Sequence, residues 1–206
     1  MPTPSRSIVV FDLGGVLIDW NPRYLYRKLI ADEAAMEDFL TTVCTQDWNE
    51  RQDAGRSFAE AATLLKAQHA DKAHLIDAFG ARFDEMMAGP IAGSVDILGE
   101  LRASGVKLYG LTNWSAETYP LALRRFDFLS WFRGVLVSGE VGLIKPDPDF
   151  YRLLFERFAI PPEEAVYIDD NPRNAAAATA LGMHGIPFTE PETLRRELCS
   201  LGVLGA

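Results

Sequence analysis

Cysteine and long apolar runs are scarce in this sequence of 206 residues. The two cysteines, Cys44 and Cys199, have neither the spacing of metal ligands nor a paired framework, so we expect reduced thiols. No apolar run is long enough to span a bilayer. Residues 1–7 are too short and too polar to form a signal peptide. We therefore predict a cytoplasmic protein rather than a disulfide-stapled or membrane-spanning one.

Positive charge is also in short supply. The chain has 20 Lys and Arg residues against 29 Asp and Glu residues, which leaves a net charge of -9. Nucleic acids and anionic membranes bind basic surfaces, so we expect neither as a partner. An anionic small molecule would have to be held locally, by a metal, a lysine and backbone amides. The oligomeric state cannot be inferred from these features.

The order of apolar segments predicts the fold class. A hydrophobic fraction of 48% is enough for one substantial core and a small accessory unit. Apolar runs predict strands at residues 8–11, 106–112, 134–137, 165–169 and 183–186. Helical patterns separate the later strands, at residues 94–103, 116–125, 147–159, 172–181 and 192–201. This alternation predicts an α/β fold with a Rossmann-like, doubly wound parallel sheet and helices on both faces.

The segment between the first two strands has a different character. Residues 22–87 show helical spacing without a convincing strand, with amphipathic helices expected to start at Pro22 and to cover residues 34–43, 57–65 and 73–87. Short helices of this kind pack as a small bundle. Residues 89–93 (GPIAG) break the pattern and predict a return hinge. We therefore predict a core of residues 1–18 and 90–206, with an all-helical cap of residues 19–89 inserted after the first strand.

Polar and charged residues follow the ends of the predicted strands. Because parallel strands bring their carboxyl ends to one edge of a sheet, we expect these side chains to lie close together. Carboxylates that cluster without a cation repel one another, so the acidic members favour a hard divalent metal at this edge. The residues are Asp12, Thr112, Asn113, Lys145, Asp169 and Asp170.

Four ordered motifs carry a family resemblance. They are residues 11–16 (FDLGGV), 111–113 (LTN), 145–146 (KP) and 167–170 (YIDD). In this order they resemble the haloacid dehalogenase (HAD) superfamily of aspartate-nucleophile hydrolases, most of which are phosphatases, and the resemblance covers essentially the whole chain. It implies a Mg²⁺-dependent hydrolase of small phosphate monoesters with a helical cap, similar to sugar 1-phosphate phosphatases.

The resemblance also implies roles for the matched residues. Asp12 would attack phosphorus and form an aspartyl-phosphate. Mg²⁺ would be held by the Asp12 carboxylate, the Gly14 carbonyl and Asp169, with Asp170 in the metal shell or just behind it. Thr112, Asn113 and Lys145 would orient the phosphoryl group. Such a site is physically coherent, because a metal and a lysine neutralise charge that would otherwise keep two anions apart.

Gly14 departs from the superfamily pattern. Most phosphatases of this group carry at that position a second aspartate, which acts as general acid and base. Loss of such an acid costs about a hundredfold to ten-thousandfold for a poor leaving group. The departure therefore predicts a strong dependence on leaving-group quality, with anomeric phosphates cleaved faster than simple alkyl phosphates. Asp19, Asp170 or a metal-bound water could substitute, and the sequence does not choose among them.

Two alternatives follow from the same motifs. A 2-haloacid dehalogenase also lacks the second aspartate, because halide leaves without a proton and no metal is needed. Founding dehalogenases have serine and asparagine where this chain has Asp169 and Asp170, so the carboxylate pair favours a phosphatase. The second alternative is a catalytically silent binding protein with the same fold. The joint presence of Asp12, Lys145 and the metal carboxylates argues against it.

A polar segment of the predicted cap, residues 47–56, is the best candidate for substrate recognition. Trp48 and Gln52 lie one helical turn apart and could face a substrate together. An equally weighted alternative is that Trp48 anchors the helical bundle among solvated charges. Trp20 and Asn21, just past the first motif, could also line the pocket. The physiological substrate stays open, because the shape of the cap selects it.

Overall fold

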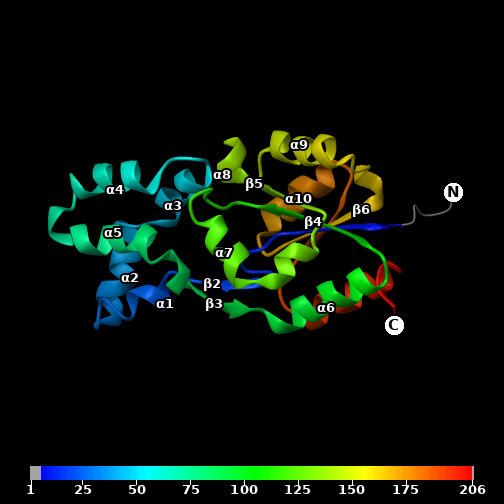
Figure 1. The fold of residues 1–206 in the computed structure, drawn as a ribbon, viewed down its shortest axis with the longest axis horizontal. Helices are drawn as coiled ribbons and strands as arrows, with labels where there is room; N and C mark the ends of the chain where they lie inside the picture. Colours follow the sequence, from blue (N-terminus) through cyan, green and yellow to red (C-terminus); the bar gives the residue numbers. More distant parts are fainter. Residues whose placement is uncertain (1–5, 206) are drawn as a thin grey trace.

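The computed structural model describes residues 6–205. Residues 1–5 and Ala206 lie outside the described residues, and with them most of the segment that was judged too polar for a signal peptide. The structure has a parallel sheet flanked by helices and a helical unit beside it (Figure 1). Within the described residues, every helix is too short or too polar to cross a lipid bilayer.

A five-stranded parallel sheet forms the centre of the larger unit. Its strand order is β5-β4-β1-β6-β7, and every neighbouring pair is parallel. The strands are β1 (Ile8–Phe11), β4 (Lys107–Thr112), β5 (Gly134–Val137), β6 (Ala165–Asp169) and β7 (His184–Pro187). β1 lies between β4 and β6, so the predicted α/β, doubly wound fold is confirmed.

Helices cover both faces of this sheet because the buried strands alternate their side chains. Val9 and Phe11 belong to one apolar cluster, which includes side chains of α6 (Ala92–Ala103) and α11 (Pro191–Ser200). Ile8 and Val10 point to the other face and pack with side chains of α9 (Pro148–Phe158) and α10 (Pro172–Ala180). The core also contains α7 (Tyr119–Arg125), and a single turn, α8 (Ser138–Val141), follows β5.

Residues 19–89, which we propose as the cap, consist mainly of short helices. Three of these helices begin at side-chain caps, because Asp32, Thr45 and Ser57 each accept a hydrogen bond from a backbone N–H in the first turn. The helices are α1 (Arg23–Tyr26), α2 (Glu33–Thr42), α3 (Gln46–Asp53), α4 (Phe58–Lys66) and α5 (Ala73–Ala81), with 3₁₀ turns at Ala70–Lys72 and Phe83–Met86.

Two short antiparallel strands connect the cap to the core. β2 (Ile18–Trp20) pairs with β3 (Met87–Pro90), and the proposed boundaries after residues 18 and 89 fall inside these strands. The predicted helix over residues 73–87 is wrong at its end, because α5 stops at Ala81 and the chain turns into β3. The predicted hinge at residues 89–93 is not a separate segment, because its first residues belong to β3 and its last residues to the first turn of α6.

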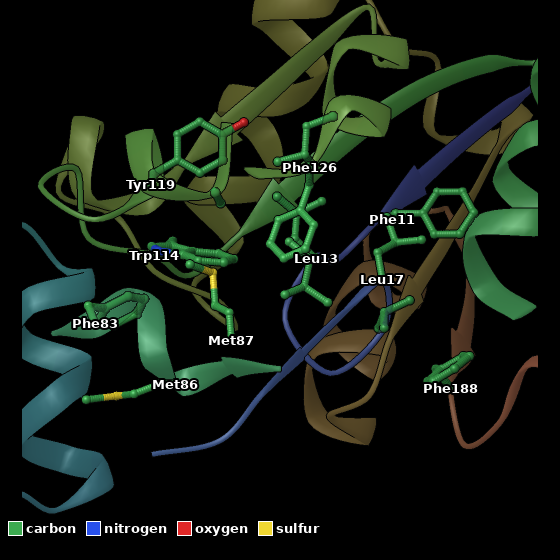
Figure 2. Packing of buried hydrophobic residues seen from close by; sticks show 14 of the residues in the cluster. Phe11, Leu13, Leu17, Phe83, Met86, Met87, Trp114, Tyr119, Phe126 and Phe188 are labelled. Carbon is green, nitrogen blue, oxygen red and sulfur yellow. The ribbon is translucent and has the colours of Figure 1, made fainter. Parts of the chain in front are cut away.

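Apolar packing holds the cap over the carboxyl edge of the sheet. One continuous cluster of buried side chains contains residues of both units. Figure 2 shows Phe83 and Met87, from the end of the cap, close to Trp114, which follows β4. The rings of Phe83 and Trp114 are 6.1 Å apart between centroids. The cap is therefore in contact with the loop that follows Thr112 and Asn113.

Candidate active site

Asp12 lies where the buried strand β1 enters a tight glycine turn. Its Oδ1 accepts a hydrogen bond of 2.7 Å from the backbone N–H of Leu13, which fixes the carboxylate direction. Gly15 has a φ of 72°, and a Cβ at this position would lie 2.2 Å from Asp170 Oδ2. Only glycine fits here without displacing that carboxylate. The turn thus brings Asp12 and Asp170 to the same edge of the sheet.

Lys145 bridges two carboxylates in the interior of the site. Its Nζ lies 2.8 Å from Asp12 Oδ2 and 2.8 Å from Asp169 Oδ2, and the lysine is 4% exposed. Asp169 is fully buried; its Oδ2 also accepts a hydrogen bond from the Tyr167 hydroxyl, and its Oδ1 accepts from the Asn174 side chain at 3.0 Å. This network fixes Asp169 from the core side.

Burial dominates the electrostatics of the site. It raises the pKa of Asp12 to about 7, with Lys145 acting in the opposite direction and Asp169 adding to the rise. The pKa of Asp170 is raised by burial and by Asp169. Burial by itself would lower the pKa of Lys145, but Asp12 and Asp169 raise it above its ordinary value. One ammonium thus faces three carboxylates, which leaves an excess of negative charge for a further cation.

The donor set fits a hard divalent cation. Asp12, Asp169 and Asp170 can each offer one oxygen, and these oxygens lie within 4.8 Å of one another. The backbone of Gly14 lines the same cavity. Carboxylate and carbonyl oxygens are the ligands that Mg²⁺ prefers, so the residues present suit this ion.

Thr112 and Asn113 lie beside this cluster, at the end of β4. Thr112 is buried and lines the cavity. The Asn113 side chain makes two hydrogen bonds with the backbone of Lys145: Nδ2 donates to its carbonyl at 3.1 Å, and Oδ1 accepts from its N–H at 2.8 Å. These contacts hold the backbone of Lys145 close to the end of β4. Asn113 therefore positions Lys145, a role that the motif alone does not indicate.

A cavity of about 480 Å³ opens above these residues. Its core wall includes Asp12, Thr112, Asn113, Lys145 and Asp170. Its cap wall is formed by Trp20, Gln46, Asn49, Glu50, Asp53 and Phe83. The site is therefore completed by the cap, and Trp20 lies at the cavity as its place in the sequence suggested.

The expectation that Trp48 and Gln52 face the substrate is wrong. The Trp48 ring packs against Phe58 and Phe79 inside the cap, at centroid distances of 6.4 and 5.1 Å. Gln52 is fully buried, donating to the Trp48 carbonyl at 2.6 Å and accepting from Arg56 at 2.7 Å. These two residues therefore anchor the helical bundle of the cap, which is the alternative role that the sequence analysis gave for Trp48.

The opposite face of α3 borders the cavity. Gln46, Asn49, Glu50 and Asp53 recur at helical spacing and share this face. Sequence reasoning singled out the segment but chose the wrong side of the helix. The i, i+3, i+7 spacing of Gln46, Asn49 and Asp53 was a signal for the correct side. It was weak, because α3 is polar almost all the way round.

Changes on this face are expected to alter substrate choice. We expect Asn49→Ala and Glu50→Gln to change the ratio of kcat/KM values between substrates of different shape, because both residues border the cavity. Trp48→Phe keeps an aromatic ring in the cap interior and is the matched control. It should lower the melting temperature while the substrate ratios stay the same. A substrate panel ranked identically by all variants would contradict this assignment.

Comparison with known proteins identifies the family. Residues 7–182 match the family model described as haloacid dehalogenase-like hydrolase. The chain belongs to this family. It is similar to a sesquiterpene phosphatase of Aspergillus oryzae, with 27% identity over 93% of this chain and 94% of the relative. It is also similar to a phosphorylated carbohydrates phosphatase of Thermotoga maritima, with 26% identity over 86% of this chain and 82% of the relative.

The fold of a solved family member agrees with the present one. An HAD family enzyme of Bacteroides thetaiotaomicron, solved in complex with magnesium and inorganic phosphate, superposes with a TM-score of 0.67 and 22% identity. The match covers 89% of this chain and 94% of that enzyme. The HAD-like chain is therefore a hydrolase, and its phosphatase relatives together with the carboxylate cluster support phosphate-ester hydrolysis as the general reaction.

Proposed function

We propose that this HAD-like hydrolase is a Mg²⁺-dependent phosphatase of small phosphorylated metabolites, acting in the cytoplasm through an aspartyl-phosphate. The observation that carries this proposal is the convergence of Asp12, Asp169 and Asp170 around Lys145 beside the cavity. A dehalogenase that works without metal has no use for three clustered carboxylates. The buried lysine and the carboxylates also argue against a silent binding protein, because such a charged cluster is costly to bury.

In the proposed reaction, Asp12 is the nucleophile. One of its oxygens forms a bond to phosphorus while the bond from phosphorus to the leaving oxygen breaks. Water then attacks phosphorus, the bond to Asp12 breaks, and inorganic phosphate leaves. Lys145 favours the ionised form of Asp12 and attracts the phosphoryl oxygens, Asn113 holds Lys145, and Thr112 lies where it can hydrogen-bond the phosphoryl group. Mg²⁺ held by Asp12, the Gly14 carbonyl, Asp169 and Asp170 would neutralise further charge on the phosphoryl group.

A panel of phosphate esters tests the proposal. It includes sugar 1-phosphates, other phosphorylated carbohydrates, sesquiterpenyl phosphates and p-nitrophenyl phosphate, with 2-chloropropionate alongside. We expect phosphate release that needs Mg²⁺ and stops on addition of EDTA. Chloride release that is indifferent to EDTA would support the dehalogenase instead, and the absence of both products would support the silent binding protein.

Asp169→Ala is expected to weaken Mg²⁺ binding and turnover together. The substitution removes a fully buried carboxylate from the proposed metal shell. Changes behind a metal shell already cost about tenfold to a hundredfold in affinity, so a ligand should cost at least as much. Titration calorimetry with Mg²⁺ measures affinity separately from catalysis. Asp170→Ala, measured in the same way, distinguishes a direct ligand from a residue behind the shell. Unchanged affinity and rate in Asp169→Ala would exclude this metal assignment.

A further inference from the structure

The proposed reaction requires a proton at the leaving oxygen, and Gly14 cannot supply it. In phosphoryl transfer the attacking and leaving oxygens lie roughly in line on opposite sides of phosphorus. Asp12 attacks from the sheet edge, so the leaving oxygen points away from the core. The cap covers that side of the cavity. A carboxylic acid on the cap wall would therefore face the leaving oxygen.

Asp53 is a buried carboxylic acid on that wall. It is the last residue of α3, is 7% exposed and borders the same cavity as Asp12 and Lys145. Its Oδ2 accepts a hydrogen bond of 3.1 Å from Asn49 Nδ2. Asn49 thus orients the carboxyl group from one helical turn earlier.

A contact across the two units fixes the position of Asp53. The Ser138 hydroxyl donates to the Asp53 carbonyl at 2.5 Å and accepts from the Trp114 N–H at 2.9 Å. Ser138 begins α8 directly after β5, and Trp114 follows β4 by two residues. Asp53 is therefore anchored, through its own backbone, to the sheet edge that carries Thr112.

We propose that Asp53 is the general acid and base of the reaction, replacing the carboxyl group that Gly14 lacks. The inference rests on the proposed phosphatase function. As the bond from phosphorus to the leaving oxygen breaks, the Asp53 proton moves to that oxygen and an alcohol departs, leaving Asp53 as carboxylate. In the second step the carboxylate takes a proton from the attacking water, the bond from phosphorus to Asp12 breaks, and Asp53 is again protonated.

The surroundings of Asp53 suit a proton donor at neutral pH. Burial raises its pKa to about 7, and Glu50 on the same helix adds to the rise. Lys145 and a hydrogen bond from the Ser115 backbone act in the opposite direction. The turn α8, which contacts Asp53 through Ser138, also carries the acidic residue Glu140, and that side chain is exposed to solvent. A general acid works best when its pKa lies near the operating pH.

The two residues first considered as substitutes are less well placed. The Asp19 carboxylate accepts hydrogen bonds from the Tyr24 hydroxyl at 2.8 and 3.0 Å, and it is not among the described residues that border the cavity. Asp170 belongs to the carboxylate cluster proposed to bind Mg²⁺, and a carboxylate that binds a metal has no proton to donate. Among the acidic residues of the described chain, Asp53 is the one that is both buried and on the cap wall.

The dependence of rate on the leaving group tests this inference. We measure kcat/KM for wild type and Asp53→Asn over esters from p-nitrophenyl phosphate to simple alkyl phosphates. Asp53→Asn should lose about a hundredfold to ten-thousandfold on alkyl esters and less than about tenfold on p-nitrophenyl phosphate, whose phenolate leaves without a proton. The wild type should then depend only weakly on leaving-group pKa, which revises the strong dependence expected from Gly14 alone. Asp47→Asn, an exposed acid at the start of the same helix, is the matched control and should behave as wild type.

Each outcome separates this inference from the function on which it rests. Wild type that hydrolyses no ester overturns the proposed function and the role of Asp53 with it. Active wild type with an equal loss on every ester in Asp53→Asn overturns the inference alone, because a structural role does not distinguish leaving groups. Asparagine keeps the oxygen that accepts from Asn49, so the variant should fold, and thermal melting verifies this. Asp53→Glu should recover part of the alkyl-ester rate. The inference is also overturned if this rescue fails and the dependence of kcat/KM on leaving-group pKa is the same in Asp53→Asn as in the wild type.

Discussion

Replacing Asp12 with asparagine is expected to lower turnover by at least about a thousandfold, with the fold intact. Loss of a nucleophile in a covalent mechanism has costs of this order or larger. The change is nearly isosteric, and the Asn oxygen can still accept the 2.7 Å hydrogen bond from the Leu13 N–H. What disappears is the carboxylate oxygen that attacks phosphorus. Phosphate release under saturating substrate and Mg²⁺ measures the effect.

Beryllium fluoride adds a second readout for the same variant. It mimics an aspartyl-phosphate, so it should bind wild type in the presence of Mg²⁺ and fail to bind Asp12→Asn. Asp19→Asn is the matched control, because Asp19 follows the same glycine turn but its carboxylate is held by Tyr24. Normal turnover in Asp12→Asn would end the covalent mechanism, whatever the control shows.

Replacing Lys145 with methionine is expected to remove both activity and a large share of the stability. Methionine fills a similar volume, but Asp12 and Asp169 are left buried without their cation. Breaking a buried ion pair in this way costs about 3–5 kcal/mol. Urea denaturation without divalent metal measures the loss. Lys28→Met is the control, since Lys28 pairs with Glu85 on the surface and should matter little.

The pH dependence of the Lys145→Met loss identifies its cause. The pKa of Asp12 already stands at about 7 against an ordinary 3.8, and removal of the lysine raises it further. For an acid whose pKa is raised on folding, stability is lost as pH increases from the ordinary pKa through the folded-state pKa. The penalty should therefore be small near pH 4 and largest at pH 8. Mg²⁺ should restore part of it by binding the folded state. A penalty independent of pH would point to lost packing instead.

Much of the core could be predicted because its signals are local. Apolar runs of strand length define β5 and β6 with the same bounds in sequence and structure, Gly134–Val137 and Ala165–Asp169. The central strands β1 and β6 are buried along their whole length, so their sequences are apolar and end abruptly at polar residues. That pattern brings Asp12 and Asp169 to one edge before any coordinates are known.

The connection between cap and core could not be predicted in the same way. β2 and β3 have only three and four residues, and they are strands because they pair with each other across about seventy positions of sequence. Nothing local marks such short segments. The helical pattern of α5 therefore seemed to continue through Phe83 and Met86. Phe83 is buried against Trp114 of the core, which is a tertiary contact that the local pattern does not reveal.

The sequence by itself determined the α/β core, the family motifs and the acidic cluster, because strand periodicity and order along the chain are enough to bring these residues together. Only the tertiary structure decided which side of α3 borders the cavity. That helix is polar on nearly every side, so its orientation follows from Trp48 packing on Phe79 and from Ser138 binding the Asp53 carbonyl. Both contacts join residues that are far apart in sequence: the first depends on how the helices of the cap pack together, and the second on how the cap sits on the core.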